Sequence, residues 1–296
     1  MENLHVDTRG SGTPVVVLES GIAASSVSWA LVRDEIAKFA TVVSYDRAGF
    51  GYSGPPDHNC TAADAARDLA AMLEHHIPGP YLLVGHSFGG LIVRRYQQDH
   101  PGRVAGMVLL DPVIRSEWRN ASGRKKVMLG RGVMLSRRGA WMAKVGIVGF
   151  ALRKLVSGSN TLPKMMAKAS AGPGSGVAVR LANQVKKLPR ETWPVMAEHW
   201  SKAQSFRTMA DYLESLPESV TQLDERRTLG ELPITILTAE TTGPDGIREH
   251  ATDSRLSRRG QHRIIAGSGH WLQLDQPAEV IEAVREMCAV IEMGAQ

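Results

Sequence analysis

The chain has few cysteines, no long apolar run and no start typical of an exported protein. Among its 296 residues are two cysteines, Cys60 and Cys288, too few and too far apart for a disulfide framework or a thiolate metal site. We expect both to be small apolar core residues. No uncharged apolar run reaches the roughly 18 residues of a membrane-spanning helix, and the first residues lack the features of a secretory signal. These absences predict a soluble, cytoplasmic protein.

Acidic residues are missing from one long stretch. From Arg119 to Arg190 the chain has 16 Lys or Arg and no Asp or Glu. Residues 113–230 hold 21 basic and 8 acidic residues, whereas the remainder holds 14 and 22, so a net charge of +5 hides a strongly basic middle. No nucleic-acid recognition motif accompanies this charge, and we therefore expect no nucleic acid partner.

Strand and helix patterns alternate in the rest of the chain. Apolar β-rich runs predict strands at 14–18, 41–45, 82–84, 104–110, 233–238 and 263–266, and apolar periodicity predicts helices near 29–39, 61–75, 91–96, 248–258 and 277–293. The helix from 61 should be capped by Thr61 or Asn59. A further β-rich run at 4–8 is expected to form a hairpin with 14–18 through Arg9-Gly10-Ser11-Gly12. Such alternation indicates an α/β protein with a mostly parallel, doubly wound sheet.

Between 113 and 230 the alternation gives way to helical periodicity with glycine-rich breaks such as 171–176. We therefore predict an α/β core formed by 1–112 and 231–296, with 113–230 inserted as a basic helical cap or lid. Three interpretations of the basic charge remain open. The cap recognises an anionic substrate, it makes peripheral contact with an anionic membrane, or it is a solvated basic face over an apolar pocket lining.

One serine is framed by glycines at a predicted strand-to-helix corner. Gly85-His86-Ser87-Phe88-Gly89 follows the apolar strand at 82–84 and precedes the helical pattern at 91–96. A serine hydroxyl reacts as a nucleophile only when it is exposed and lies beside a base. The G-x-S-x-G turn provides the exposure, and its glycines avoid collisions with the adjoining strand and helix.

Three motifs in order resemble those of the α/β-hydrolase fold family. Residues 85–90 resemble its nucleophile elbow, 45–53 its D-x-x-G-x-G-x-S turn, and Gly267-Ser268-Gly269-His270-Trp271 its late G-H motif. The resemblance covers 4–111 and 231–293. It implies Ser87 as nucleophile and His270 as general base and then acid. It also implies a small-molecule substrate and no metal or cofactor.

The resemblance also implies an oxyanion hole made by the backbone N–H groups of Ile22 and Phe88. Ile22 is placed by matching Ser20-Gly21-Ile22 to the H-G-x loop of the family. Ser20 therefore stands where the family usually has a histidine. This change leaves open how the loop is ordered.

The third member of the triad departs from the usual pattern. Most of the family places the acid after the strand that follows the cap, and that position falls on Thr242. Asp111 instead ends the strand before the cap, as the acid does in haloalkane dehalogenases and pancreatic-type lipases. We therefore predict Asp111 as the acid, with Asp245 and Glu240 as alternatives.

These residues predict a serine hydrolase that cleaves a carboxylic ester, thioester or lactone through an acyl-serine intermediate. Alternatives on the same fold are a carbon–carbon bond hydrolase, an amidase or a cofactor-free perhydrolase. A ligand receptor or scaffold that has lost the chemistry is the alternative from another class. An anionic or acyl-bearing substrate is one of the interpretations that the basic cap leaves open, and no motif identifies its binding residues.

Overall fold

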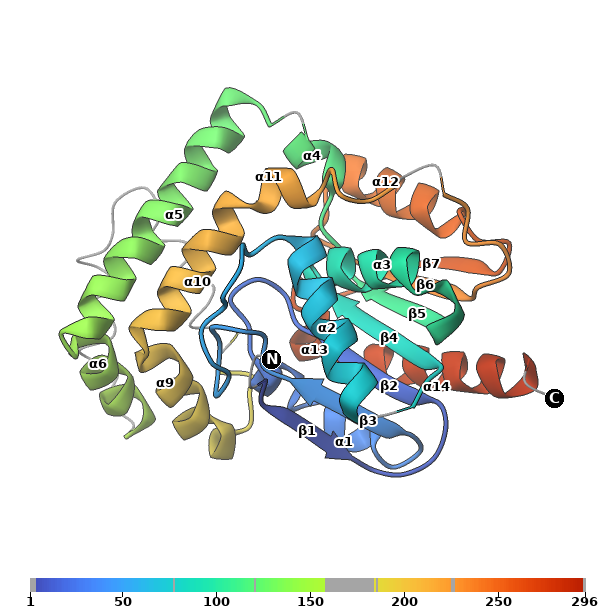
Figure 1. Ribbon diagram of the computed structural model, residues 1–296, viewed down its shortest axis with the longest axis horizontal. Helices are drawn as coiled ribbons and strands as arrows, with labels where there is room; N and C mark the ends of the chain where they lie inside the picture. Colours follow the sequence, from blue (N-terminus) through green and yellow to red (C-terminus); the bar gives the residue numbers. More distant parts are fainter. Residues whose placement is uncertain are drawn as a thin grey trace.

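A seven-stranded sheet forms the centre of the computed structural model, which describes residues 4–76, 78–119, 121–157, 184, 186–224 and 227–294. The strand order is β1-β3-β2-β4-β5-β6-β7, and every neighbouring pair except β1–β3 is parallel (Figure 1). The strands are β1 (Val6–Arg9), β2 (Val15–Glu19), β3 (Thr41–Tyr45), β4 (Tyr81–His86), β5 (Val104–Leu110), β6 (Ile234–Ala239) and β7 (Gly260–Ile265). The predicted α/β class and mostly parallel sheet are confirmed.

The hairpin predicted for the first two strands is wrong. β1 pairs antiparallel with β3, Val6 lying opposite Tyr45, while β2 lies between β3 and β4. All five residues of β2 are buried, as is typical of a central strand in a parallel sheet. β1 carries Asp7 and Arg9, whose charges suit a sheet edge. The composition of the connecting turn therefore did not determine which strands pair.

Successive side chains along the strands divide the core between the two faces of the sheet. Val17 and Leu83 pack on one face with α2 and α3, and Val16 and Leu82 pack on the other with α1 and α14 (Figure 1). The helices outside the segment between β5 and β6 are η1 (Ser26–Trp29), α1 (Arg33–Ile36), α2 (Ala62–His76), α3 (Gly89–Asp99), η2 (Pro101–Arg103), α12 (Pro244–Ser254), α13 (Leu272–Asp275) and α14 (Pro277–Gly294).

The two cysteines are core residues, as expected. Cys60 belongs to the core on one face of the sheet and Cys288 to the core on the other, and both are free thiols. Burial raises the pKa of each thiol to about 12. Both therefore remain protonated near neutral pH.

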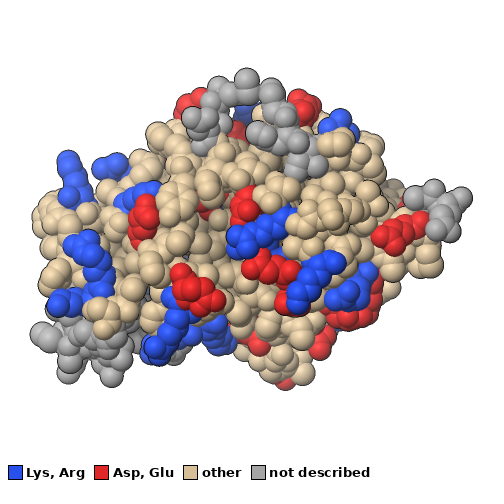
Figure 2. All heavy atoms as spheres, turned by 90° about the horizontal axis from the view of Figure 1, so that it is seen from below, with Lys and Arg blue, Asp and Glu red and all other residues tan. Residues whose placement is uncertain are grey.

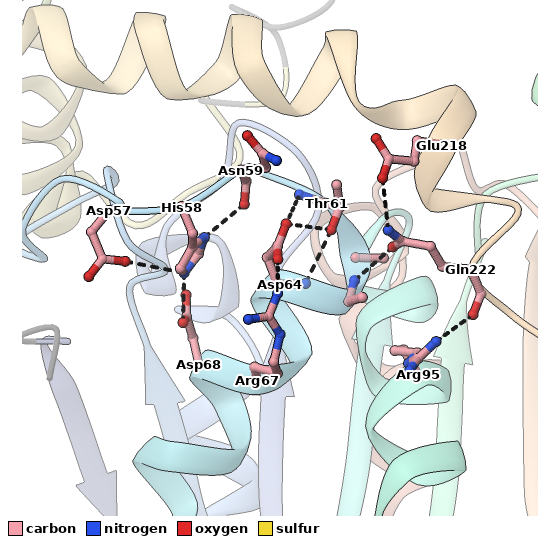
Figure 3. A network of polar contacts seen from close by, with 12 residues as sticks. Asp57, His58, Asn59, Thr61, Asp64, Arg67, Asp68, Arg95, Glu218 and Gln222 are labelled. Carbon is pink, nitrogen blue, oxygen red and sulfur yellow. Dashed lines mark hydrogen bonds and ion pairs between the residues drawn. The ribbon is translucent and has the colours of Figure 1, made fainter.

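The start of α2 is capped by its own residues and by the segment that precedes β6 (Figure 3). Thr61 Oγ1 donates to Asp64 Oδ2 (2.6 Å) and accepts from the Asp64 N–H (3.2 Å), so Thr61 rather than Asn59 caps the helix. The backbone N–H groups of Ala62 and Ala63 donate to Ser219 Oγ (3.0 Å) and Gln222 Oε1 (2.9 Å), respectively. These bonds satisfy donors that a helix start leaves free and attach the later segment to the core.

The segment between β5 and β6, called the insertion from here on, contains no strand among its described residues. The helices that its described residues form are α4 (Arg115–Arg119), α5 (Gly123–Lys144), α6 (Ile147–Val156), η3 (Arg190–Thr192), α9 (Trp193–Ser201), α10 (Ala203–Glu214) and α11 (Leu216–Ser219). α5 and α10 lie side by side (Figure 1). The predicted boundaries at 113 and 230 and the role as a cap stay predictions, and the glycine-rich run 171–176 lies outside the described residues.

None of the helices in the described ranges combines the length and apolar character that crossing a bilayer would require.

The insertion contacts the core at loops that follow β2 and β3. His199 Nδ1 lies 3.0 Å from Ser25 Oγ, and Lys202 donates to the Gly51 carbonyl (2.7 Å). The ring of Tyr212 in α10 lies 5.3 Å from that of Phe88, the residue after the glycine-framed serine. The inserted helices therefore lie close to the end of β4.

A buried ionic cluster joins the first helix of the insertion to two core helices. Asp253 of α12 accepts hydrogen bonds from Arg94 of α3 (2.6 Å) and from both terminal nitrogens of Arg115 in α4 (2.5 and 2.8 Å). All three side chains are buried. Burial alone would raise the pKa of Asp253, but the two guanidinium groups hold this pKa below its ordinary value.

We expect Asp253→Asn to lower the free energy of unfolding by about 3 kcal/mol, because it removes the carboxylate that accepts hydrogen bonds from two buried guanidinium groups. Urea denaturation would measure the change. Asp245→Asn is the matched control on the same helix, since the Asp245 side chain is 74% exposed and pairs with exposed Arg248. That control should change the free energy by less than about 0.5 kcal/mol. Equal losses in the two variants would contradict a stabilising role for the cluster.

Candidate active site

Ser87 lies at the corner between β4 and α3 in a left-handed backbone conformation, with φ of 54°. Two glycines make the corner sterically feasible. A Cβ at Gly89 would lie 2.4 Å from the Glu19 carbonyl oxygen, and one at Gly85 would lie 2.8 Å from the Gly89 backbone. The Ser87 N–H donates to the Leu110 carbonyl at 3.0 Å, which ties the corner to the end of β5. The predicted sharp turn is therefore present.

The structure brings His270 and Asp111 to Ser87. His270 lies in the loop after β7, with Nε2 2.9 Å from Ser87 Oγ and Nδ1 2.6 Å from Asp111 Oδ2. An ionised carboxylate only accepts hydrogen bonds, so Nδ1 carries a proton and donates it, leaving Nε2 to accept the Ser87 hydroxyl. A hydrogen-bonded chain therefore links a carboxylate, an imidazole and a hydroxyl.

Asp111 is buried and is held in place by the loop after β6. It follows β5 with φ of 41°, and its Oδ1 accepts from the Ala239 N–H (3.2 Å) and from Thr242 Oγ1 (2.6 Å). Burial would raise the pKa of Asp111, but its hydrogen bonds with His270 and Thr242 hold that pKa below the ordinary value. Thr242, at the position where the family usually has its acid, thus contributes a hydroxyl donor to a carboxylate on the neighbouring strand.

The two alternative acids lie elsewhere. Asp245 is in the first turn of α12 and pairs with Arg248. Glu240 Oε2 accepts the Gly267 N–H at 2.8 Å, so it supports the loop that leads to His270. In the part of the chain that the structure describes, neither carboxylate bonds to His270.

The backbone N–H groups of Ile22 and Phe88 make no hydrogen bond among the described residues. Phe88 directly follows Ser87, and the Ile22 loop also approaches the serine. A Cβ at Gly21 would lie 3.3 Å from Ser87 Cβ. Two unengaged donors are therefore present in the segments where the resemblance places an oxyanion hole.

A buried ion pair holds the loop that leads to Ile22. Arg47 Nη2 donates to the Gly21 carbonyl at 2.6 Å, and Nη1 donates both to Glu19 Oε1 (2.6 Å) and to the Ser20 carbonyl. Arg47 is 4% exposed and Glu19 is fully buried. One guanidinium group therefore engages a carboxylate and two consecutive carbonyl groups of the loop.

The Glu19–Arg47 pair was not predicted from the sequence. A charged residue ending an apolar strand, as Glu19 does, was the available signal, but it does not reveal its distant partner. Other side chains complete the arrangement, since the Tyr45 hydroxyl donates to Glu19 and Trp29 Nε1 donates to Ser20 Oγ at 2.9 Å. Ser20, which stands where the family usually has a histidine, thus has a buried hydrogen-bond partner of its own in Trp29.

An apolar cluster shared by the insertion and the core lies beside His270. Leu188 and Met196 of the insertion pack with Leu274 of α13, and Trp271 borders the cluster. The Trp271 ring lies 5.3 Å from the ring of His86.

Among the described residues, no three His, Cys, Asp or Glu side chains are placed to hold a metal ion.

Comparisons with known proteins agree with the fold. A family model described as alpha/beta hydrolase fold matches residues 14–277. The uncharacterized protein YqjL of Bacillus subtilis is 34% identical over 107 residues, which are 36% of this chain and 42% of that protein. This chain therefore spans less than half the length of that relative.

Two solved structures are similar over nearly the whole chain. A thermophilic esterase from Thermogutta terrifontis has a TM-score of 0.66 at 20% identity, covering 98% of this chain and 94% of that one. A Pseudomonas aeruginosa protein provisionally assigned as an epoxide hydrolase has a TM-score of 0.71 at 19% identity, covering 99% and 94%. At these sequence identities, the structural similarity shows that this chain shares the fold of the two proteins.

His86, next to Ser87, is a buried neutral histidine. Its Nε2 lies 2.8 Å from the His270 carbonyl oxygen, to which it donates, while its buried Nδ1 has no partner within the described chain. Burial lowers the pKa of His86 to about 3. An unfolded chain binds this proton with a pKa of about 6.5. Between these values the unfolded state binds more protons, so stability falls as the pH falls from about 6.5 toward 3.

We expect His86 to account for a loss of about 2 kcal/mol in unfolding free energy between pH 7 and pH 5. His86→Gln removes this titration, so the variant should lose less stability than the wild type over that interval. Urea denaturation at the two pH values would measure the difference. Identical pH dependence in the two proteins would contradict the assignment of a neutral buried imidazole.

Proposed function

The chain belongs to the alpha/beta hydrolase fold family, and on that premise we propose that it is a serine hydrolase for carboxylic esters, thioesters or lactones. The observation that carries this proposal is the chain of hydrogen bonds from Asp111 through His270 to Ser87. The likeness in fold to a thermophilic esterase is consistent with it.

In the proposed reaction, Ser87 Oγ attacks the substrate carbonyl carbon while His270 Nε2 takes the hydroxyl proton. The tetrahedral oxyanion accepts hydrogen bonds from the N–H groups of Ile22 and Phe88. His270 then gives its proton to the leaving oxygen or sulfur, and an acyl-serine ester remains. Water attacks that ester with His270 again acting as base, which releases the acid and restores Ser87.

Asp111 acts through His270 in this scheme. Its carboxylate keeps the proton on Nδ1 and stabilises the imidazolium that forms when Nε2 takes the Ser87 proton. Thr242 supports that role, because its hydroxyl satisfies the other carboxylate oxygen and helps keep it ionised. The acid is therefore proposed to come from β5, with the loop after β6 in a supporting position.

Glu19 and Arg47 are proposed as positioning residues for the oxyanion hole. Arg47 holds the carbonyl groups of Ser20 and Gly21, the two residues before Ile22. A donor aimed in advance at the developing charge stabilises it without reorganisation during the reaction. The buried ion pair would thus replace the ordering that the family's histidine provides.

The nucleophile argues against epoxide opening, although one structural relative is provisionally assigned to that activity. Epoxide hydrolases of this fold use a carboxylate nucleophile, and Ser87 occupies that position.

The apolar cluster of Leu188, Met196 and Trp271 beside His270 suits an acyl group. We therefore propose that the insertion acts as a cap that contributes to an acyl-binding wall.

A fluorophosphonate probe should form a single covalent adduct on Ser87, since only a serine activated by a nearby base attacks phosphorus readily. Peptide mass spectrometry would locate the adduct. Ser87→Ala should remain unlabelled while keeping the wild-type circular dichroism spectrum. Absence of labelling in the folded wild type would reject the enzyme proposal and favour a non-catalytic ligand receptor.

Asp111→Asn should lower kcat for p-nitrophenyl ester hydrolysis by about 10⁴-fold, because an amide cannot enforce the required imidazole tautomer. Asp245→Asn removes the same negative charge as Asp111→Asn but at an exposed site, and it should leave kcat within about twofold of the wild-type value. Initial rates across a series of acyl chain lengths would test both variants. Loss of activity in Asp245→Asn with retention in Asp111→Asn would contradict the proposed position of the acid.

A further inference from the structure

Most large apolar side chains exposed by the described residues belong to the first two long helices of the insertion. Eight of the eleven are in α5, α6 or the turn between them, namely Val127, Met128, Met134, Leu135, Trp141, Val145, Ile147 and Phe150. Trp141 is 63% exposed. Large apolar side chains gathered in this way commonly mark a binding surface rather than an ordinary solvated one.

Six residues form a continuous strip along α5, called the α5 face from here on. They recur every three or four positions, which places them on one side of the helix, and they are Val127, Arg131, Met134, Arg138, Trp141 and Val145. The opposite side of α5 is buried through Val133, Ala140 and Ala143, and α10 packs along the helix. Within the described residues, the α5 face therefore adds no side chain to the core.

The charges on these two helices have one sign. α5 and α6 together carry nine Lys or Arg and no Asp or Glu. Arg137 pairs with Glu214 (2.7 Å) and Lys125 with Glu117, but in the described chain no carboxylate pairs with Arg131 or Arg138. Figure 2 shows basic side chains standing out at the end of the molecule where Figure 1 places α5 and α6. This surface is complementary to an anionic partner.

A hollow on α5 brings the apolar and basic groups together. Its volume is about 430 Å³, and it is lined by Gly130, Val133, Met134, Arg137, Arg138 and Trp141. The lining thus combines an indole and a thioether with two guanidinium groups. Guanidinium groups bind phosphate oxygens, and indole rings favour the boundary between lipid headgroups and acyl chains.

We propose that the α5 face, with Ile147 and Phe150 at the start of α6, binds the surface of an anionic lipid bilayer. The apolar side chains enter the boundary between headgroups and acyl chains, while Arg131 and Arg138 contact lipid phosphates. The charges on α5 keep the helix in the plane of the interface. This proposal rests on exposure and charge alone and does not depend on the proposed chemistry at Ser87.

The test is sedimentation of the 296-residue chain with vesicles of phosphatidylcholine alone and of phosphatidylcholine mixed with phosphatidylglycerol. We expect binding to the mixed vesicles, weakening as salt is added, and little binding to the neutral ones. Each arginine near an anionic surface contributes about fivefold to partitioning, so Arg131→Gln with Arg138→Gln should weaken binding by about 25-fold. Trp141→Ser should also weaken it.

The matched control is Arg248→Gln with Arg258→Gln, which removes the same charge from exposed positions of the core. The control should retain most of the wild-type binding. Equal binding to neutral and anionic vesicles, an unaffected α5 double variant, or an equal loss in the control would each overturn the proposal. So would a dimer, detected by sedimentation velocity, that Trp141→Ser dissociates, because a second copy would then cover the α5 face.

Discussion

The site depends on the register of adjacent parallel strands at their carboxyl ends. His86 of β4 lies opposite Leu110 of β5, so Ser87 and Asp111 leave the sheet side by side. Leu110 in turn lies opposite Leu237 of β6, which brings the end of β6 and the loop after it to the Asp111 carboxylate. His270 then reaches both from the loop after β7. A slip of one residue between β4 and β5 would separate the serine from the acid, since successive side chains point to opposite faces.

The parts of the site that were predictable are those encoded within a few consecutive residues. The corner at Ser87 needs an apolar strand, two glycines and a helix, all within one short stretch. The loop before His270 is similarly local. Asp111 was predicted because Thr242 stands at the family's usual acid position and a carboxylate ends the strand before the cap, as in haloalkane dehalogenases and pancreatic-type lipases. In each case a motif of a few consecutive residues, together with the resemblance to the family, was enough to make the prediction.

Contacts between distant segments escaped prediction for the converse reason. Arg47 and Glu19 lie 28 positions apart and Thr242 and Asp111 lie 131 positions apart, and nothing in either neighbourhood specifies the partner. The pairing of β1 with β3 was missed because the order of strands is set by which one can be buried on both sides. The basic charge of 113–230 likewise left several interpretations open, and the packing of α5 on α10 shows which side of that helix is buried without deciding among them.

The Glu19–Arg47 pair has a consequence for how this chain tolerates substitution. Both groups are buried, so a change at either one strands a charge in an apolar setting, whereas changing both at once removes that penalty. The two positions should therefore behave as one unit with strong epistasis, and Tyr45 shares in it because its hydroxyl donates to Glu19. Replacing Ser20 alone with the family's histidine would put an imidazole where the Ser20 hydroxyl now accepts a hydrogen bond from Trp29 Nε1. Accessible evolutionary routes between the two arrangements must pass through coordinated replacements.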